Sequence, residues 1–135
     1  MKKLLSTKYS AGAFNFAMLV MRVGFAGLVL PHGYDKLVRF ASMEKQMINF
    51  FGIGQTASLA LVIFSEFFCA LFVLFGLFTR LATIPLIISM TAAVTLAHKG
   101  RIFGDGEHAA LYAVAFFVIL LVGPGKISAD GMMGK

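Results

Sequence analysis

Charged residues are almost absent from four long apolar stretches of the chain and are concentrated between them. The four stretches cover residues 9–31, 57–78, 81–97 and 109–123. Within them only Arg22 and Glu66 carry a charge. A helix of a soluble protein carries charged residues along one face, whereas a long run without charges is typical of a membrane-spanning helix. We therefore predict an all-α fold, an integral membrane four-helix bundle that forms a single domain over residues 1–135.

The segments between these stretches predict how the helices are connected. The turn between residues 78 and 80 is so short that the second and third helices must form an antiparallel hairpin. Segment 35–53 places apolar residues at helical spacing with charged residues between them, which predicts an amphipathic helix in the membrane interface. Pro31 is expected to kink the far end of the first helix, and the Gly-Pro-Gly sequence at 123–125 ends the fourth.

Composition supports the membrane class and excludes several others. Charged residues make up 13% of the chain, compared with about 25% in soluble domains, and mean hydropathy is +0.89. The single cysteine, Cys69, excludes an intramolecular disulfide and a paired-cysteine redox motif. The net charge of +6 comes without a basic run or an aromatic-interleaved patch. It therefore favours the anionic headgroups of a lipid bilayer as partner and not nucleic acid.

The N-terminal residues predict how the chain is placed in the membrane. Lys2, Lys3 and Lys8 precede the first span, which favours termini in the cytoplasm. The same arrangement resembles a secretory signal, but Arg22 interrupts the apolar stretch and no convincing cleavage site follows it. We therefore expect an uncleaved first helix in a multi-pass protein.

With four antiparallel spans, the three histidines are expected at one end of the bundle. His32, His98 and His108 follow or precede spans that meet there, together with Lys36 and Glu107. The opposite end has only Arg80 and the basic termini, so we expect the chemistry at the histidine-bearing end. Imidazole and carboxylate groups could bind a metal ion, but the histidines lack paired spacing, and we predict no metal site. Proton transfer by a histidine or glutamate is favoured instead.

The two charges inside the spans suggest a buried ion pair. Arg22 and Glu66 each lie near the midpoint of their stretch, so on neighbouring helices they should reach similar depths. We predict that they pair inside the bundle, either to set the helix register or to line a polar cavity for a ligand or proton. Val29, Gly33 and Lys36 fall within about 40° of Arg22 on a helical wheel, and the four residues form one stripe. Tyr112 either donates a hydrogen bond inward or anchors the fourth helix at the interface.

Several short motifs follow one another in order along the chain. They are RVGF at 22–25, HGYDKL at 32–37, FFGIG at 50–54, Glu66, LFGLFTR at 74–80 and GPGKISAD at 123–130. This combination resembles the DoxX family of small four-helix bacterial membrane proteins. The one departure is Ala129, which stands where the family has leucine in a Ser-Leu-Asp ending.

The resemblance implies a location in the bacterial cytoplasmic (inner) membrane and an association with redox chemistry. Relatives are linked to thiosulfate:quinone oxidoreductase, in which a DoxX-like domain is the membrane subunit. We therefore expect a quinone-like or other small molecule in an intrahelical polar cavity, and a soluble oxidoreductase as partner. The candidate ligand-binding residues are Arg22, His32, Lys36, Glu66, Glu107, His108 and Tyr112.

An alternative without catalysis remains open at this point. The chain would then be a docking or structural subunit for a soluble partner, and loop residues would matter more than Arg22. No dinucleotide, haem-attachment or nucleophile motif is present in the sequence. The sequence therefore leaves open whether the chain is itself an oxidoreductase component. Glycines along the first helix, Gly12, Gly24 and Gly33, would permit close packing in a homo-oligomer.

Overall fold

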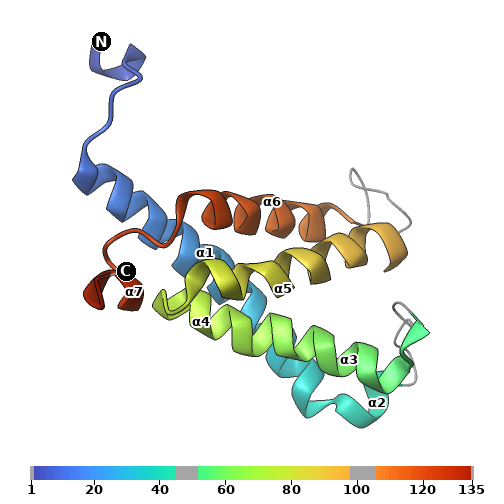
Figure 1. The fold of residues 1–135 in the computed structure, drawn as a ribbon. Coiled ribbons are helices and arrows are strands. Elements are labelled where there is room, and N and C mark those ends of the chain that lie inside the picture. The colour runs from blue at the N-terminus through green and yellow to red at the C-terminus, as the bar shows by residue number, and fades with distance from the viewer. Residues whose placement is uncertain (1, 45–51, 98–105, 135) are drawn as a thin grey trace.

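Four apolar helical segments build the molecule (Figure 1), and the computed structural model describes residues 2–44, 52–97 and 106–134. The four segments are α1 (Ala11–Val38), the continuous run α3–η3–α4 (Gln55–Ile63, Phe64–Cys69, Ala70–Phe75), α5 with η4 (Thr79–Ala92, Ala93–Ala97) and α6 (Glu107–Val122). Three short helices accompany them, η1 (Lys2–Leu5), α2 (Phe40–Glu44) and α7 (Ala129–Met132). The prediction of an all-α bundle is confirmed.

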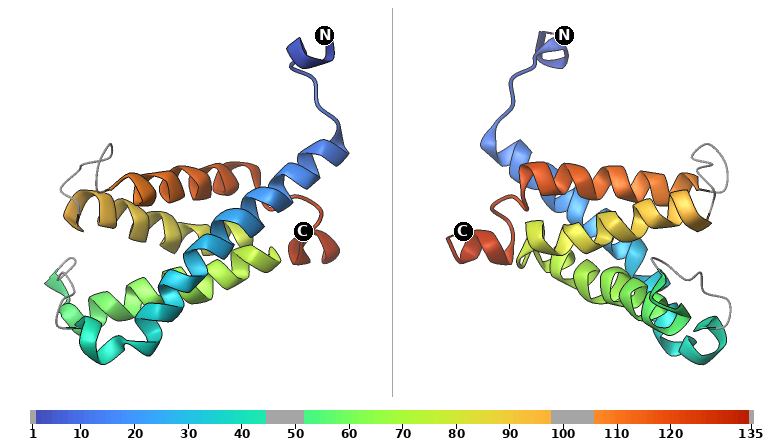
Figure 2. Two further views of the ribbon diagram at one scale, coloured as in Figure 1. Left: turned by 180° about the vertical axis from the view of Figure 1, so that it is seen from behind. Right: turned by 45° about the vertical axis from the view of Figure 1, so that its right-hand side comes forward.

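The helices are not all parallel to one another. Helix α5 packs along α6, while α1 packs against η3 and α4 and also contacts α6. Figure 2 shows α1 crossing the other helices obliquely. The start of α1, the turn between α4 and α5, the end of α6 and helix α7 lie toward one end of the bundle, which we call the terminal end (Figure 1).

Side-chain size is distributed as expected for helices in lipid. Many interior positions hold small or hydroxyl-bearing residues, namely Ala26, Ser58, Ser65, Ala70, Ala82 and Thr83. Large apolar side chains on the outer surface include Phe72, Phe75, Leu81, Leu111 and Leu121. Small residues let helix backbones approach closely where the hydrophobic effect cannot drive packing. A large apolar outer surface is correspondingly suited to lipid.

The lengths of two of the helices agree with a location in a membrane. Segments Ala11–Val38 and Gln55–Phe75 are each long and apolar enough to cross a membrane. The segments Thr79–Thr95 and Glu107–Val122 are apolar but shorter. The bundle therefore has two long candidate spans and two shorter apolar helices.

The first helix is longer than predicted. It continues through Pro31 to Val38, beyond residue 31 where the predicted span ends. Contacts that Gly33 and Lys36 make with η3, described below, favour helix beyond the proline. The first part of the predicted interfacial segment forms the end of α1 and helix α2, whereas residues 45–51 lie outside the described part of the chain.

Candidate functional site

The second span contains a π-helical turn around its charged residue. Residues Phe64–Cys69 form η3, with α-helix on both sides. A π-helical segment inserts an extra residue into a turn and is found frequently at functional sites. Glu66 lies in this turn and is buried.

Glu66 pairs with Lys36 and not with Arg22. The Nζ atom of Lys36 lies 2.7 Å from Oε2 of Glu66, and the two side chains are 25% and 9% exposed. The predicted Arg22–Glu66 pair is therefore wrong. An ion pair so largely removed from solvent is costly to break by removing one partner, because the other charge is left uncompensated.

Backbone contact between α1 and η3 makes this pair possible. A Cβ atom on Gly33 would lie 2.6 Å from the carbonyl carbon of Glu66 and 2.8 Å from the amide nitrogen of Phe67. Those distances are too short for any side chain, so only glycine permits this crossing. Lys36 is three residues after Gly33 and so lies on the same face of α1, beside Glu66.

The predicted stripe on the first helix is confirmed. The buried residues of α1 are Met18, Arg22, Ala26, Val29 and Gly33, with Lys36 partly buried after them. His32 falls outside the stripe and is exposed. The periodicity of the helix, already visible in the sequence, accounts for both observations.

At the start of α6, Glu107 and His108 are exposed, and His98 lies outside the described residues. Tyr112 is partly buried, with its ring edge-on to Phe25 at 6.1 Å between centroids.

The structure thus joins two of the predicted residues, Lys36 and Glu66, and no hydrogen bond or ion pair among the described residues links His32, Glu107 or His108 to them. No group of three His, Cys, Asp or Glu side chains that could hold a metal ion occurs in 2–44, 52–97 and 106–134.

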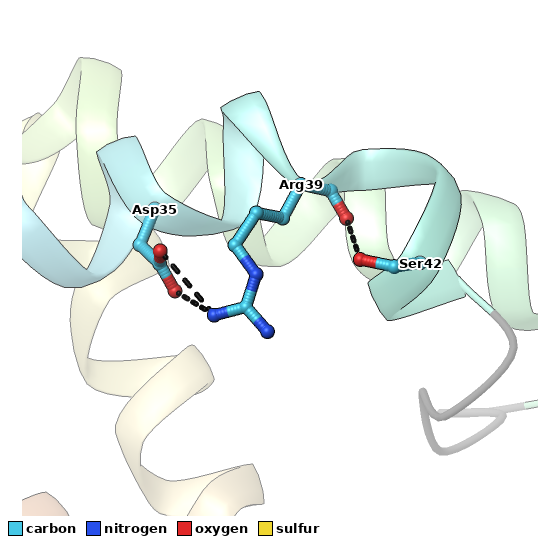
Figure 3. A network of polar contacts seen from close by, with 3 residues as sticks. All are labelled: Asp35, Arg39 and Ser42. Atoms are coloured by element: carbon cyan, nitrogen blue, oxygen red, sulfur yellow. Dashed lines mark hydrogen bonds and ion pairs between the residues drawn. The ribbon is translucent and has the colours of Figure 1, made fainter.

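An exposed ion pair on the same helix provides a contrast. Figure 3 shows Arg39 beside Asp35, with Nη1 and Oδ2 3.1 Å apart, and Ser42 donating to the carbonyl oxygen of Arg39. The paired side chains are 59% and 52% exposed. Exposed pairs contribute at most about 1 kcal/mol to stability. Arg39 is therefore a suitable control position for experiments on Lys36.

Arg22 has a different role from the predicted one. It is 1% exposed, and its Nη1 donates to the carbonyl oxygens of Val73 and Leu74 at 3.3 and 3.1 Å. Its Nη2 donates to the carbonyl oxygen of Ile127 in the C-terminal segment. The first two acceptors end helix α4, where the helix dipole favours a cation. Arg22 therefore caps α4 and fastens the C-terminal segment to the bundle.

Asp130 completes this attachment from the other side. Its Oδ1 and Oδ2 accept hydrogen bonds from the amides of Phe78 and Thr79, each at 2.9 Å. Its own amide donates to the carbonyl oxygen of Gly76 at 2.8 Å. The carboxylate thus caps the start of α5 from a distant part of the chain.

Because residue 76 is glycine, the turn between α4 and α5 can approach both the guanidinium group of Arg22 and the C-terminal segment. It has φ of 73°, and a Cβ atom there would collide with Ser128 and lie 2.5 Å from Nη1 of Arg22. A dense polar network therefore occupies the terminal end of the bundle as well. Carbonyl acceptors have no residue signature, which is why the sequence did not indicate this role for Arg22.

Replacing Asp130 with alanine is expected to lower the free energy of unfolding by about 1–2 kcal/mol, because the amides of Phe78 and Thr79 lose their acceptors. Thermal unfolding in detergent micelles would measure the change. Asp130→Asn, which keeps one acceptor oxygen, should lose less. Equal melting temperatures for the alanine variant and the native protein would contradict the capping role.

A comparison with known protein families identifies the family of the chain. The DoxX family model matches residues 17–99, more than half of the chain, which includes Arg22, Lys36, Glu66 and Thr79. Helix α6 and the C-terminal segment lie outside the match. Neither a curated protein nor a solved structure matches the chain. With its apolar helical bundle and this family match, the chain belongs to the DoxX family of small membrane proteins.

Proposed function

We propose that the protein binds a quinone-like small molecule inside the membrane, beside the Lys36–Glu66 pair. The observation that carries this proposal is the largely buried ion pair on a π-helical turn within a membrane span. Ionisable side chains inside membrane spans are expensive to maintain and mark functional sites.

The chemistry of the pair suits a carbonyl-bearing ligand. A lysine ammonium has three donors, and one of those on Lys36 is engaged by Glu66. The others can bind the carbonyl oxygen of a quinone, while Glu66 balances the charge. A quinone has an apolar ring with two acceptors, and ligand sites of this kind combine apolar walls with few polar groups.

Aromatic rings on the helices that carry the pair are suited to the ring of such a ligand. The ring of Tyr34 lies 6.3 Å from that of Phe67, which follows Glu66 in η3. On the side of α6, Phe25 and Tyr112 form the edge-on contact already described. Aromatic side chains favour offset or edge-on contact with a further ring.

This proposal moves the binding site away from Arg22. Three backbone carbonyl groups hold its guanidinium group at the terminal end. Its charge is thus engaged in fastening the fold, whereas the ammonium of Lys36 remains partly accessible.

In the proposed arrangement the chain is the quinone-holding subunit in the bacterial cytoplasmic membrane, with its termini in the cytoplasm. A soluble oxidoreductase supplies the electrons. The resemblance to the DoxX family, some of whose relatives are linked to thiosulfate:quinone oxidoreductase, supports this arrangement, as does the basic N-terminal segment.

The test is mass spectrometry of organic extracts from gently purified protein. We expect quinone in about equimolar amount with the native chain, and at least about tenfold less with Lys36→Met, because a charge-assisted hydrogen bond is lost. Glu66→Gln should also lower the quinone content, since Lys36 then loses the carboxylate that positions it.

Arg39→Met is the matched control, because it removes a cation from the same helix without touching the buried pair. It should retain the native amount of quinone. If the native protein carries no quinone, or if Lys36→Met retains as much as Arg39→Met, the proposal is wrong. The absence of any bound small molecule would favour the alternative of a docking subunit, and the next experiment would be to isolate its partner.

A further inference from the structure

A groove opens at the terminal end of the bundle, away from the Lys36–Glu66 pair. Its volume is about 880 Å³, within the range of small-molecule sites. The residues that line it come from the start of α1, the start of α5, the end of α6 and the C-terminal segment. Four separate parts of the chain therefore meet around one hollow.

Two cations of the groove have no partner in the part of the chain that the structure describes. Arg80 and Lys126 both line it and are both exposed. Among residues 2–44, 52–97 and 106–134, neither side chain has a hydrogen-bond or ion-pair partner. The acidic residue of the lining, Asp130, is engaged in capping α5. The groove therefore offers an excess of positive charge.

The position of Arg80 directs that charge into the groove. A Cβ atom on Gly123 would lie 3.2 Å from Nη2 of Arg80, so the guanidinium group lies over the glycine that ends α6. The amide of Lys126 donates to Oδ1 of Asn15 at 3.0 Å, which fixes the backbone that carries the second cation.

The remaining walls are apolar and aromatic. They include Phe14, Phe78, Leu81 and Val122, with Tyr9 at the edge. Leu81 and Val122 are also exposed on the outer surface of the bundle, which the lipid covers. The groove thus combines cations at the end of the bundle with apolar walls that continue toward the bilayer.

We propose that this groove binds an anionic phospholipid, with Arg80 and Lys126 contacting the phosphate of the headgroup and the apolar walls contacting an acyl chain. Basic groups near a membrane surface attract anionic lipids, and arginine suits the geometry of a phosphate group. The headgroup phosphate and an acyl chain of a phospholipid would both contact complementary groups in this groove. A soluble phosphate ester would leave the apolar walls exposed.

Native mass spectrometry of the full chain in detergent, titrated with phosphatidylglycerol or phosphatidylcholine, tests this proposal. We expect the native protein to retain phosphatidylglycerol preferentially. The double variant Arg80→Gln/Lys126→Gln should bind it about tenfold more weakly, since each cation near the surface contributes to the attraction. Both side chains are exposed, so the variant is expected to fold, and its melting temperature in micelles checks this.

Arg39→Gln is the matched control, an exposed arginine on α1 outside the groove, and it should keep the native affinity. Equal affinities for the two lipids, or an unchanged preference in the double variant, would overturn the proposal. Displacement of the lipid by millimolar glycerol phosphate would also overturn it, because the ligand would then be a soluble phosphate ester. Quinone retention is expected to be the same in all these variants, so this proposal and the proposed function fail separately.

Discussion

Replacing Arg22 with methionine is expected to lower the free energy of unfolding by roughly 3–5 kcal/mol and to release the C-terminal segment. Methionine fills much of the same space but donates no hydrogen bond. The carbonyl groups of Val73, Leu74 and Ile127 would lose a charged donor in a largely buried setting. Helix α4 would lose its cap and the segment after α6 one of its attachments.

Two measurements separate these effects. Unfolding in mixed micelles gives the loss of stability, and limited proteolysis at Lys126 reports release of the segment. Arg39→Met, which removes an exposed arginine, should change neither. A native melting temperature together with loss of bound quinone in Arg22→Met would instead restore Arg22 as a ligand-binding residue.

Replacing Gly33 with alanine is expected to destabilise the bundle by about 1–3 kcal/mol, although alanine is the better helix former. The added methyl group would meet the backbone of Glu66 and Phe67, which cannot rotate away as a side chain can. Helix α1 must then move away from η3. Because Lys36 is on the same face, its contact with Glu66 should lengthen, and quinone retention should fall together with stability.

Gly24→Ala is the matched control for this prediction. Apart from the adjacent residues and the backbone of the helix itself, nothing lies within 4 Å of a Cβ built at Gly24, which belongs to the same helix. Its replacement should leave the fold unchanged or stabilise it by up to about 1 kcal/mol through the gain in helix propensity. A melting temperature for Gly33→Ala at or above that of Gly24→Ala would show that the backbone crossing is not as close as described.

The sequence alone predicted the features that depend on local pattern. Runs without charge identified the apolar helices, because burying a charge in lipid is costly wherever the helix packs. The stripe from Arg22 to Gly33 and Lys36 followed from helical periodicity, which is the same in every α-helix. The motifs also indicated the family, since several of their residues, among them Gly33 and Gly76, lie where the backbone tolerates no side chain.

Only the tertiary structure decided which groups the two buried charges contact. Comparing the midpoints of the spans assumed helices of equal length and tilt, but α1 runs obliquely and continues past Pro31 (Figure 2). That geometry brings Lys36, and not Arg22, beside Glu66. The acceptors of Arg22 are backbone carbonyl groups, which every residue carries, so no pattern of side chains can indicate them. A sequence shows which charges must be buried, whereas the packing of the helices determines what neutralises each one.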